Sequence, residues 1–141
     1  MTDLPDVNLW VAMADKRHIH HPLAQDYWSQ NGGKQFAFCS TTRQGFLRII
    51  TNAKAVVNPK THAEAWTVYR EFRALPNIQL LPEPTGLETH FHTLSTAPDF
   101  PHRMWTDAYL AAVAIASGSR LVSFDTDFAR FPGLSFLHLA P

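Results

Sequence analysis

Three aspartates late in the chain have positions from which they could do chemistry together. Asp107 opens a run of strong helix formers at 108–116, and Asp125 and Asp127 directly follow a short apolar run at 120–124. The helix formers predict an α-helix, and the apolar run predicts a buried strand. In an open parallel α/β sheet, ligands bind beyond the carboxyl ends of the strands. Asp125 and Asp127 are therefore expected at a binding edge.

A fourth aspartate, Asp6, lies near the other end of the chain. Residues 4–9 predict a short strand and residues 9–14 a first helix, so Asp6 is expected where strand becomes helix. Each aspartate also has a simpler explanation as a turn former after Pro5, a first-turn acid or a cap. Capping explains each acid separately but does not explain their common position at one edge of a sheet.

Four carboxylates at one edge favour a particular chemistry. Their negative charges repel one another unless a cation neutralises them. Ligand sets made only of oxygen select Mg²⁺ or Mn²⁺ over zinc. One such ion, or a pair about 4 Å apart, can bind a phosphodiester, activate a water and stabilise the leaving oxygen. The acids thus predict metal-assisted phosphodiester hydrolysis, and no GxxxxGK, GxSxG, HExxH or CxxC motif supports a rival chemistry.

The elements that must position these acids alternate along the chain. Alternating strands and helices predict one α/β domain over residues 1–141, with three layers and a central parallel sheet of four to five strands. Strands are expected at 4–9, 35–39, 78–81, 120–124 and 134–139. Helices are expected at 9–14, from Pro22 to Gly32, from the cap Ser40 through Thr51, at 61–75 with the capping box of Thr61 and Glu64, at 87–94 and at 108–116.

Composition narrows the class of protein. A chain of 141 residues with 45% hydrophobic and 17% charged residues is typical of one globular domain. The formal net charge of zero means that a polyanion must be held by a local cluster or by metal ions. The single Cys39 and the lack of a basic and apolar leader indicate the cytoplasm. No apolar run approaches the roughly 20 residues of a membrane span.

Histidines form a second group of residues with possible chemistry. His18, His20 and His21 could join His90 and His92 in a zinc cluster. The spacing fits no compact zinc pattern and cysteine partners are lacking, so solvated or capping histidines are the preferred interpretation.

One helix carries an aromatic stripe, Trp66, Tyr69 and Phe72, at helical spacing. We expect it to form core or dimer surface, because platforms that stack nucleic acid bases are usually interleaved with basic residues. Arg48, on a mostly apolar helix, could contact a phosphate or pair with a carboxylate at the edge of the core. The structural pairing is slightly favoured.

Four short motifs, in order along the chain, resemble those of a known family. They are Pro5-Asp6-Val7-Asn8, Gly45-Phe46-Leu47-Arg48, TDAYLAA at 106–112, and LVSFDTDF at 121–128 followed by Phe131 and Gly133-Leu134. This ordered set resembles the PIN domain and, more closely, the VapC toxins of prokaryotic toxin–antitoxin systems. The resemblance covers essentially the whole chain.

The resemblance implies an activity and a set of partners. Proteins of this kind are Mg²⁺- or Mn²⁺-dependent endoribonucleases, usually dimeric, held inactive by a VapB-type antitoxin whose tail occupies the active-site groove. Carried over position by position, Asp6, Asp107 and Asp125 match the metal-binding acids, and Asp127 matches an additional acid.

This chain departs from the family pattern at one position. PIN domains usually place a Glu three residues before the helix arginine, and here that position is Gly45. A site for one metal ion is therefore easier to defend than a site for two. The alternative function is a PIN-like fold that has lost catalysis and serves as an RNA- or protein-binding module. The residues that could supply a neutral oxygen, orient a water or support the acids are Asn8, Thr42, Gln44 and Ser123.

RNA binding by a chain without net charge would depend on local arginines. Arg43, Arg48, Arg103 and Arg130 are candidate phosphate contacts near the acids, although each could equally be solvated or paired. Arg103 and Arg130 are the preferred candidates because they are expected in loops.

Overall fold

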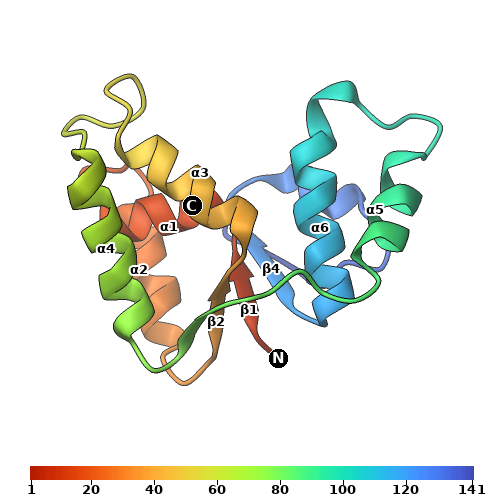
Figure 1. The fold of residues 1–141 in the computed structure, drawn as a ribbon, viewed down its shortest axis with the longest axis horizontal. Helices are drawn as coiled ribbons and strands as arrows, with labels where there is room; N and C mark the ends of the chain where they lie inside the picture. Colours follow the sequence, from red (N-terminus) through yellow and green to blue (C-terminus); the bar gives the residue numbers. More distant parts are fainter.

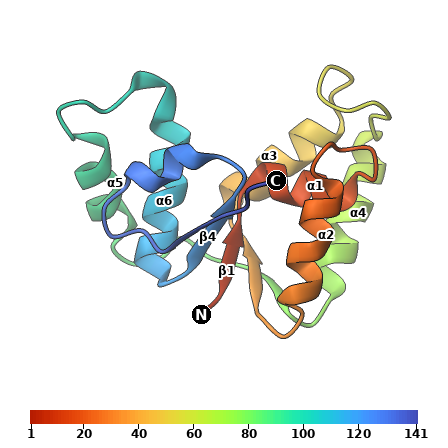
Figure 2. The same cartoon turned by 180° about the vertical axis from the view of Figure 1, so that it is seen from behind.

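The computed structural model describes residues 1–141 and contains one five-stranded parallel sheet flanked by helices (Figure 1, Figure 2). The strand order is β3-β2-β1-β4-β5, with every neighbouring pair parallel. This confirms the predicted parallel α/β architecture and gives five strands. The strands are β1 (Asp3–Pro5), β2 (Phe36–Phe38), β3 (Ile78–Leu80), β4 (Arg120–Ser123) and β5 (Phe136–His138).

The helices form two groups, with α1 to α4 on one side in Figure 1 and α5 and α6 on the other. The first group buries Trp10 and Phe46 around Phe38 of β2, and the Trp10 and Phe38 rings stack with centroids 3.9 Å apart. The second group buries the alanine-rich face of α6 against Phe128 and Leu121. No helix has both the length and the apolar character of a membrane span. The helices are α1 (Val7–Ala14), α2 (His21–Gln30), α3 (Ser40–Ile50), α4 (His62–Ala74), α5 (Leu87–Ser95) and α6 (Trp105–Ser117), with short 3₁₀ helices η1 (His102–Met104) and η2 (Thr126–Arg130).

Two element boundaries differ from the sequence prediction in ways that affect the acids. The first strand ends at Pro5 instead of continuing to Leu9, because the Asp6 carboxylate accepts a hydrogen bond from the Val7 N–H at 2.8 Å and caps α1. The helix expected at 108–116 already begins at Trp105, so Asp107 lies inside its first turn. Both acids therefore stand on helix N-termini.

The capping predictions had mixed outcomes. Thr61 and Glu64 form the predicted capping box of α4, with hydrogen bonds of 2.8 and 3.1 Å. Ser40 was wrongly predicted as the cap of α3, since it is the first helical residue and Cys39 is the cap. The Thr42 hydroxyl accepts a hydrogen bond from the Cys39 N–H at 2.9 Å, so the side chain at the third helical position satisfies the N–H of the cap residue.

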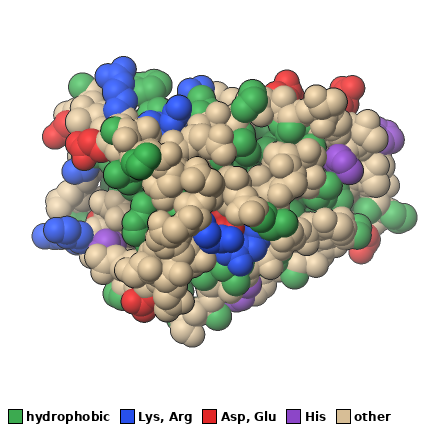
Figure 3. All heavy atoms as spheres, turned by 90° about the horizontal axis from the view of Figure 1, so that it is seen from below, with side chains coloured by type: hydrophobic (Ala, Val, Ile, Leu, Met, Phe, Trp, Pro, Cys, Tyr) green, Lys and Arg blue, Asp and Glu red, His purple; other side chains and the backbone are tan.

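A buried ion cluster fastens the edge of the sheet where the strands begin. The fully buried Asp3 accepts two hydrogen bonds from Arg120, at 2.9 and 2.7 Å, and one from the Tyr27 hydroxyl at 2.7 Å. The Lys34 ammonium lies 3.7 Å from the same carboxylate. Figure 3, which views the molecule from this edge, shows a compact group of Lys and Arg side chains near its centre. Burial and the bond to Asp3 raise the pKa of Tyr27, which keeps its hydroxyl a neutral donor. The cluster joins β1, β4 and α2.

Removing Asp3 should destabilise the protein strongly. Asp3→Ala leaves the partly buried Arg120 without its carboxylate, so we expect the free energy of unfolding to fall by about 3 kcal/mol. Asp99→Ala is the control, since Asp99 is 86% exposed and 3.8 Å from Arg130, and its loss should cost about 0.5 kcal/mol or less. Urea unfolding measures both, and equal effects would contradict a special role for the buried cluster.

Candidate active site

The pairing of β1 with β4 brings the first and the last acids of the chain to one edge. Pro5 lies opposite Val122 in the parallel register, and the Asp6 N–H donates to the Val122 carbonyl at 2.9 Å. The residues that follow β1 and those that end β4 therefore emerge side by side at the carboxyl edge of the sheet. Asp6 and Asp125 meet there although they are far apart in sequence.

A chain of hydrogen bonds links five polar residues at this edge. The buried Ser123 hydroxyl donates to Asp6 Oδ2 at 2.8 Å and accepts from the Asp125 N–H at 3.0 Å. Asp125 Oδ1 in turn accepts from the Asp127 N–H at 2.8 Å, and Asp127 Oδ2 accepts from Arg103 at 2.9 Å. Ser123 thus positions Asp6 relative to Asp125, as expected for a residue that supports the acids.

Asp107 completes the group and experiences its combined charge. Burial is the main cause that raises the pKa of Asp107 to about 6, and the negative charges of Asp6, Asp125 and Asp127 add to it. Arg103 acts in the opposite direction. Burial also raises the pKa of Asp6, against the lowering effect of its hydrogen bonds from Ser123 and Val7. The four predicted acids therefore lie within electrostatic reach of one another.

The donor chemistry of the acids fits a hard divalent cation. Four carboxylates and a hydroxyl are all-oxygen donors. Burial, with a smaller contribution from neighbouring carboxylates, raises the pKa of Asp6 and Asp107, and a bound cation would favour their charged forms. In their present rotamers, however, no three His, Cys, Asp or Glu side chains of the chain converge on one point. Asp6 and Asp125 are engaged as caps and Asp127 with Arg103, so a complete ligand set requires rotation of these side chains.

Gly45 stands where a fifth acid was expected, and packing explains the glycine. A Cβ atom at this position would lie 2.7 Å from Val7 Cγ2 and 3.3 Å from Cγ1. The side chain next to Asp6 therefore occupies the space into which a longer residue at position 45 would begin to extend. The close contact between α1 and α3 depends on this glycine.

The three residues proposed to supply neutral oxygens fare differently. Thr42 is fully buried and its hydroxyl is engaged with Cys39 in the α3 cap, so its assignment as a water or metal ligand is not supported. Asn8 and Gln44 are exposed in the first turns of α1 and α3, where their side chains are accessible from solvent.

The four candidate arginines separate into paired and unpaired groups. Arg103 pairs with Asp127 at 2.9 Å and Arg130 approaches Asp99 at 3.8 Å. The predicted pairing of Arg48 with a carboxylate is wrong, since Arg48 and Arg43 are in none of the ion pairs of the protein. The physical reason is that Arg48 lies on the exposed face of α3, away from the core edge.

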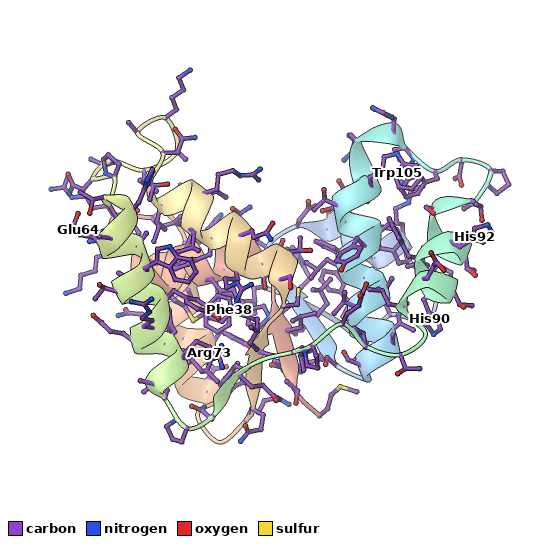
Figure 4. The ribbon with its side chains drawn as sticks, in the orientation of Figure 1. Phe38, Glu64, Arg73, His90, His92 and Trp105 are labelled. Carbon is purple, nitrogen blue, oxygen red and sulfur yellow. The ribbon has the colours of Figure 1, made fainter.

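The histidines considered for a zinc site lie in two separate places. His18 and His20 pack near the ring of Phe124, with centroid distances of 6.3 and 4.7 Å, and burial lowers the pKa of His18. His90 and His92 project from α5 on the far side of the molecule (Figure 4). Nothing in the sequence predicts the contact with Phe124, which places the histidine loop against the residue that precedes Asp125.

Comparison with known proteins agrees with this fold. The family model described as the PIN domain matches residues 4–134. The chain therefore belongs to the PIN-domain family.

Its relatives within the family share a common name. Ribonuclease VapC41 of Mycobacterium tuberculosis strain H37Rv is 34% identical over 143 residues, covering 97% of this chain and 98% of the relative. Ribonuclease VapC33 of the same strain is 32% identical over 94% of each chain. Among solved structures, VapBC2 from Rickettsia felis bound to a promoter DNA fragment aligns with a TM-score of 0.70 at 16% identity over 98% of both chains. M. tuberculosis VapC20, a sarcin-ricin loop cleaving toxin, aligns with a TM-score of 0.68 at 15% identity over 94% of this chain and 98% of that chain.

The raised pKa of Asp107 predicts a pH-dependent stability. The folded-state pKa of about 6 lies above the ordinary value of 3.8, so ionising Asp107 opposes folding, fully above pH 6 and not at all below about pH 4. We expect Asp107→Asn to raise the melting temperature in EDTA at pH 7.5 by about 2–4 °C, and to have no effect near pH 3.5. Asp26→Asn on the exposed face of α2 is the control. A lower melting temperature of Asp107→Asn at pH 7.5 would contradict the raised pKa of Asp107.

The close contact at Gly45 predicts that Gly45→Ala changes stability in opposite directions with Val7 present and with Val7 replaced by alanine. In the wild type, Gly45→Ala gains about 1 kcal/mol of helix propensity but forces an overlap with Val7 that costs about 1–3 kcal/mol, so a net loss of stability is expected. In a Val7→Ala background the overlap disappears and Gly45→Ala should become stabilising. Urea unfolding of the four proteins tests this cycle. Stabilisation in both backgrounds would show that Val7 does not exclude the side chain.

Proposed function

We propose that this protein is the toxin of a type II toxin–antitoxin system, a divalent-metal-dependent endoribonuclease that hydrolyses RNA phosphodiester bonds. The observation that carries the proposal is the group of four mutually repelling carboxylates, Asp6, Asp107, Asp125 and Asp127, at the carboxyl edge of the sheet. The relatives named ribonucleases, which align over nearly the whole chain, support it.

Three of the acids would hold Mg²⁺ or Mn²⁺. Asp6, Asp107 and Asp125 come from three different elements, which suits ligands that approach an ion from different directions. When bound, the ion would orient the scissile phosphate, lower the pKa of an attacking water and stabilise the leaving oxygen. With Gly45 in place of a further acid, one ion is the simpler assignment.

Other residues of the chain would hold and balance this group. Ser123 keeps the Asp6 carboxylate in place through its 2.8 Å hydrogen bond and ties it to the backbone of Asp125. Arg103 is 66% exposed beside Asp127, with donors left over for a phosphate oxygen. It thereby offers a positive contact for the substrate next to the acids.

Solved structures with the same fold suggest the partners of the protein. Solved structures that share the fold include the VapBC complexes of Rickettsia felis and Salmonella typhimurium, with TM-scores of 0.70 and 0.68. These complexes support a VapB-type antitoxin as the inhibitor. RNA as the substrate and a homodimer as the assembly are further parts of the proposal.

Substituting the acids should abolish cleavage without unfolding the protein. Asp6→Asn and Asp125→Asn are expected to lower the rate of RNA cleavage in Mg²⁺ by about 100-fold or more, because each removes a charged ligand. Ser123→Ala should lower it by about 10- to 100-fold, since it releases Asp6. Asp99→Asn, remote and exposed, is the control. In cells, induced expression of the wild type should arrest growth, and Asp125→Asn should not.

Two further measurements separate this function from a binding module without catalysis. Mg²⁺ at ten times its dissociation constant should raise the melting temperature of the wild type by about 5 °C and leave Asp6→Asn nearly unchanged. Sequencing of RNA ends after induction should reveal new termini that are absent with Asp125→Asn. RNA binding without new termini would instead support the impaired module, for which the close packing at Gly45 is the structural argument.

A further inference from the structure

A groove between α3 and α4 lies apart from the acids and has an unusual lining. Its volume is about 300 Å³. One arginine, one histidine and one tryptophan share it with two small apolar surfaces and a hydroxyl, and no acid contributes. The lining residues are Leu47, Arg48, Thr51, His62, Ala65 and Trp66.

Trp66 is the aromatic surface of this groove. The helical spacing of Trp66, Tyr69 and Phe72 predicted core or dimer surface, and Tyr69 is indeed buried. Trp66 is 41% exposed, with the Arg70 guanidinium 5.5 Å from its ring centroid and the Tyr69 ring 5.8 Å away at an angle of 83°. The two neighbours hold the indole in place, so it can stack a planar group with little further loss of side-chain freedom.

The groove is cationic because no carboxylate pairs with its arginine, Arg48. The ion pairs of the protein use Lys34, Arg103, Arg120 and Arg130, none of which lies on α3 or α4. Arg48 therefore faces solvent with all its donors free. An exposed, unpaired arginine beside an exposed tryptophan is the combination that binds a phosphate and a base together.

Helix α3 links the groove to the neighbourhood of the candidate active site. Gly45 of this helix touches Val7, the residue after Asp6, and Thr51 at the helix end lines the groove. Six residues of helix separate these points, which corresponds to about 9 Å. Figure 1 shows α3 running from the middle of the molecule to the loop that leads into α4.

We infer that this groove binds a single-stranded stretch of the RNA next to the cleavage point, with one base stacked on Trp66 and one phosphate on Arg48. The inference rests on the proposed ribonuclease function and adds the place where the substrate is held. Arg70 of α4 lies over the Trp66 ring, and in the folded protein α3 adds Arg48 on the groove side.

The composition of the groove favours RNA over a protein partner. Leu47 and Ala65 are its only aliphatic side chains, too few for the row of apolar anchors by which a helix docks into a groove. The unpaired positive charge of Arg48 matches a phosphodiester backbone, and a chain without net charge must hold RNA through such local contacts.

The test measures affinity for a 5′-labelled 12-nucleotide single-stranded RNA by fluorescence anisotropy in an Asp125→Asn background, which prevents cleavage. Trp66→Ala should weaken binding by about tenfold and Trp66→Tyr by less than about threefold, because tyrosine still stacks. Arg48→Gln should lower the slope of log affinity against log salt by about 0.7, the value for one phosphate contact on a single strand. The charge-matched control is Arg73→Gln, at the opposite end of α4 from Glu64 (Figure 4), which should change neither quantity.

Cleavage assays separate this inference from the proposed function. The small phosphodiester bis(4-nitrophenyl) phosphate is too short to contact the groove while it is bound at the acids. Trp66→Ala with Asp125 intact should therefore hydrolyse it in Mn²⁺ at the wild-type rate, and should cleave the 12-mer more slowly. If the wild type hydrolyses neither substrate, the proposed function fails, whereas the binding data still decide whether RNA occupies the groove. Unchanged RNA affinity of Trp66→Ala and Arg48→Gln would overturn the inference. Light scattering that showed Trp66→Ala changing the oligomeric state, with RNA affinity intact, would overturn it in favour of an interface between copies.

Discussion

The parallel pairing of β1 with β4 is the constraint on which the rest of the structure depends. β1 has three residues, yet both of its ends are fastened to β4: Asp3 binds Arg120 at one edge, and the residue after the strand, Asp6, binds Ser123 at the other. Because a shift of one residue would turn each side chain to the opposite face, these two fastenings also fix the register. The register in turn places Asp6 beside Asp125, so the sheet and the candidate active site are held by the same contacts.

In the candidate site, burial of carboxylates and their mutual repulsion oppose folding, so interactions elsewhere in the protein must compensate. Asp107 is kept near three other acids with a pKa of about 6, and only Arg103 opposes their charge directly. Such an arrangement contributes nothing to stability without a cation, and it is the kind of perturbed cluster that marks a functional site in a cleft or at a sheet edge. Its cost is carried by well-packed elements elsewhere, above all by the aromatic core around Trp10 and Phe38.

Helix α3 connects the two regions to which we assign function. Its buried face carries Gly45, where the close approach of Val7 leaves no room for a side chain. Its exposed face carries Arg48, which no carboxylate neutralises. One face therefore shapes the neighbourhood of Asp6, and the other leads toward the groove at Trp66.

The sequence by itself determined what depends on near neighbours along the chain: the alternation of strands and helices, the Thr61 and Glu64 capping box, and the placement of Asp6, Asp125 and Asp127 after strands. It misplaced the end of β1, because capping by Asp6 outweighed the strand propensity of the residues that follow. Tertiary structure alone decided the bond between Ser123 and Asp6, the raised pKa of Asp107 and the meeting of Arg48 with Trp66. Burial, repulsion and packing arise between residues that approach one another only in the folded chain, whereas propensity and capping act within a few residues.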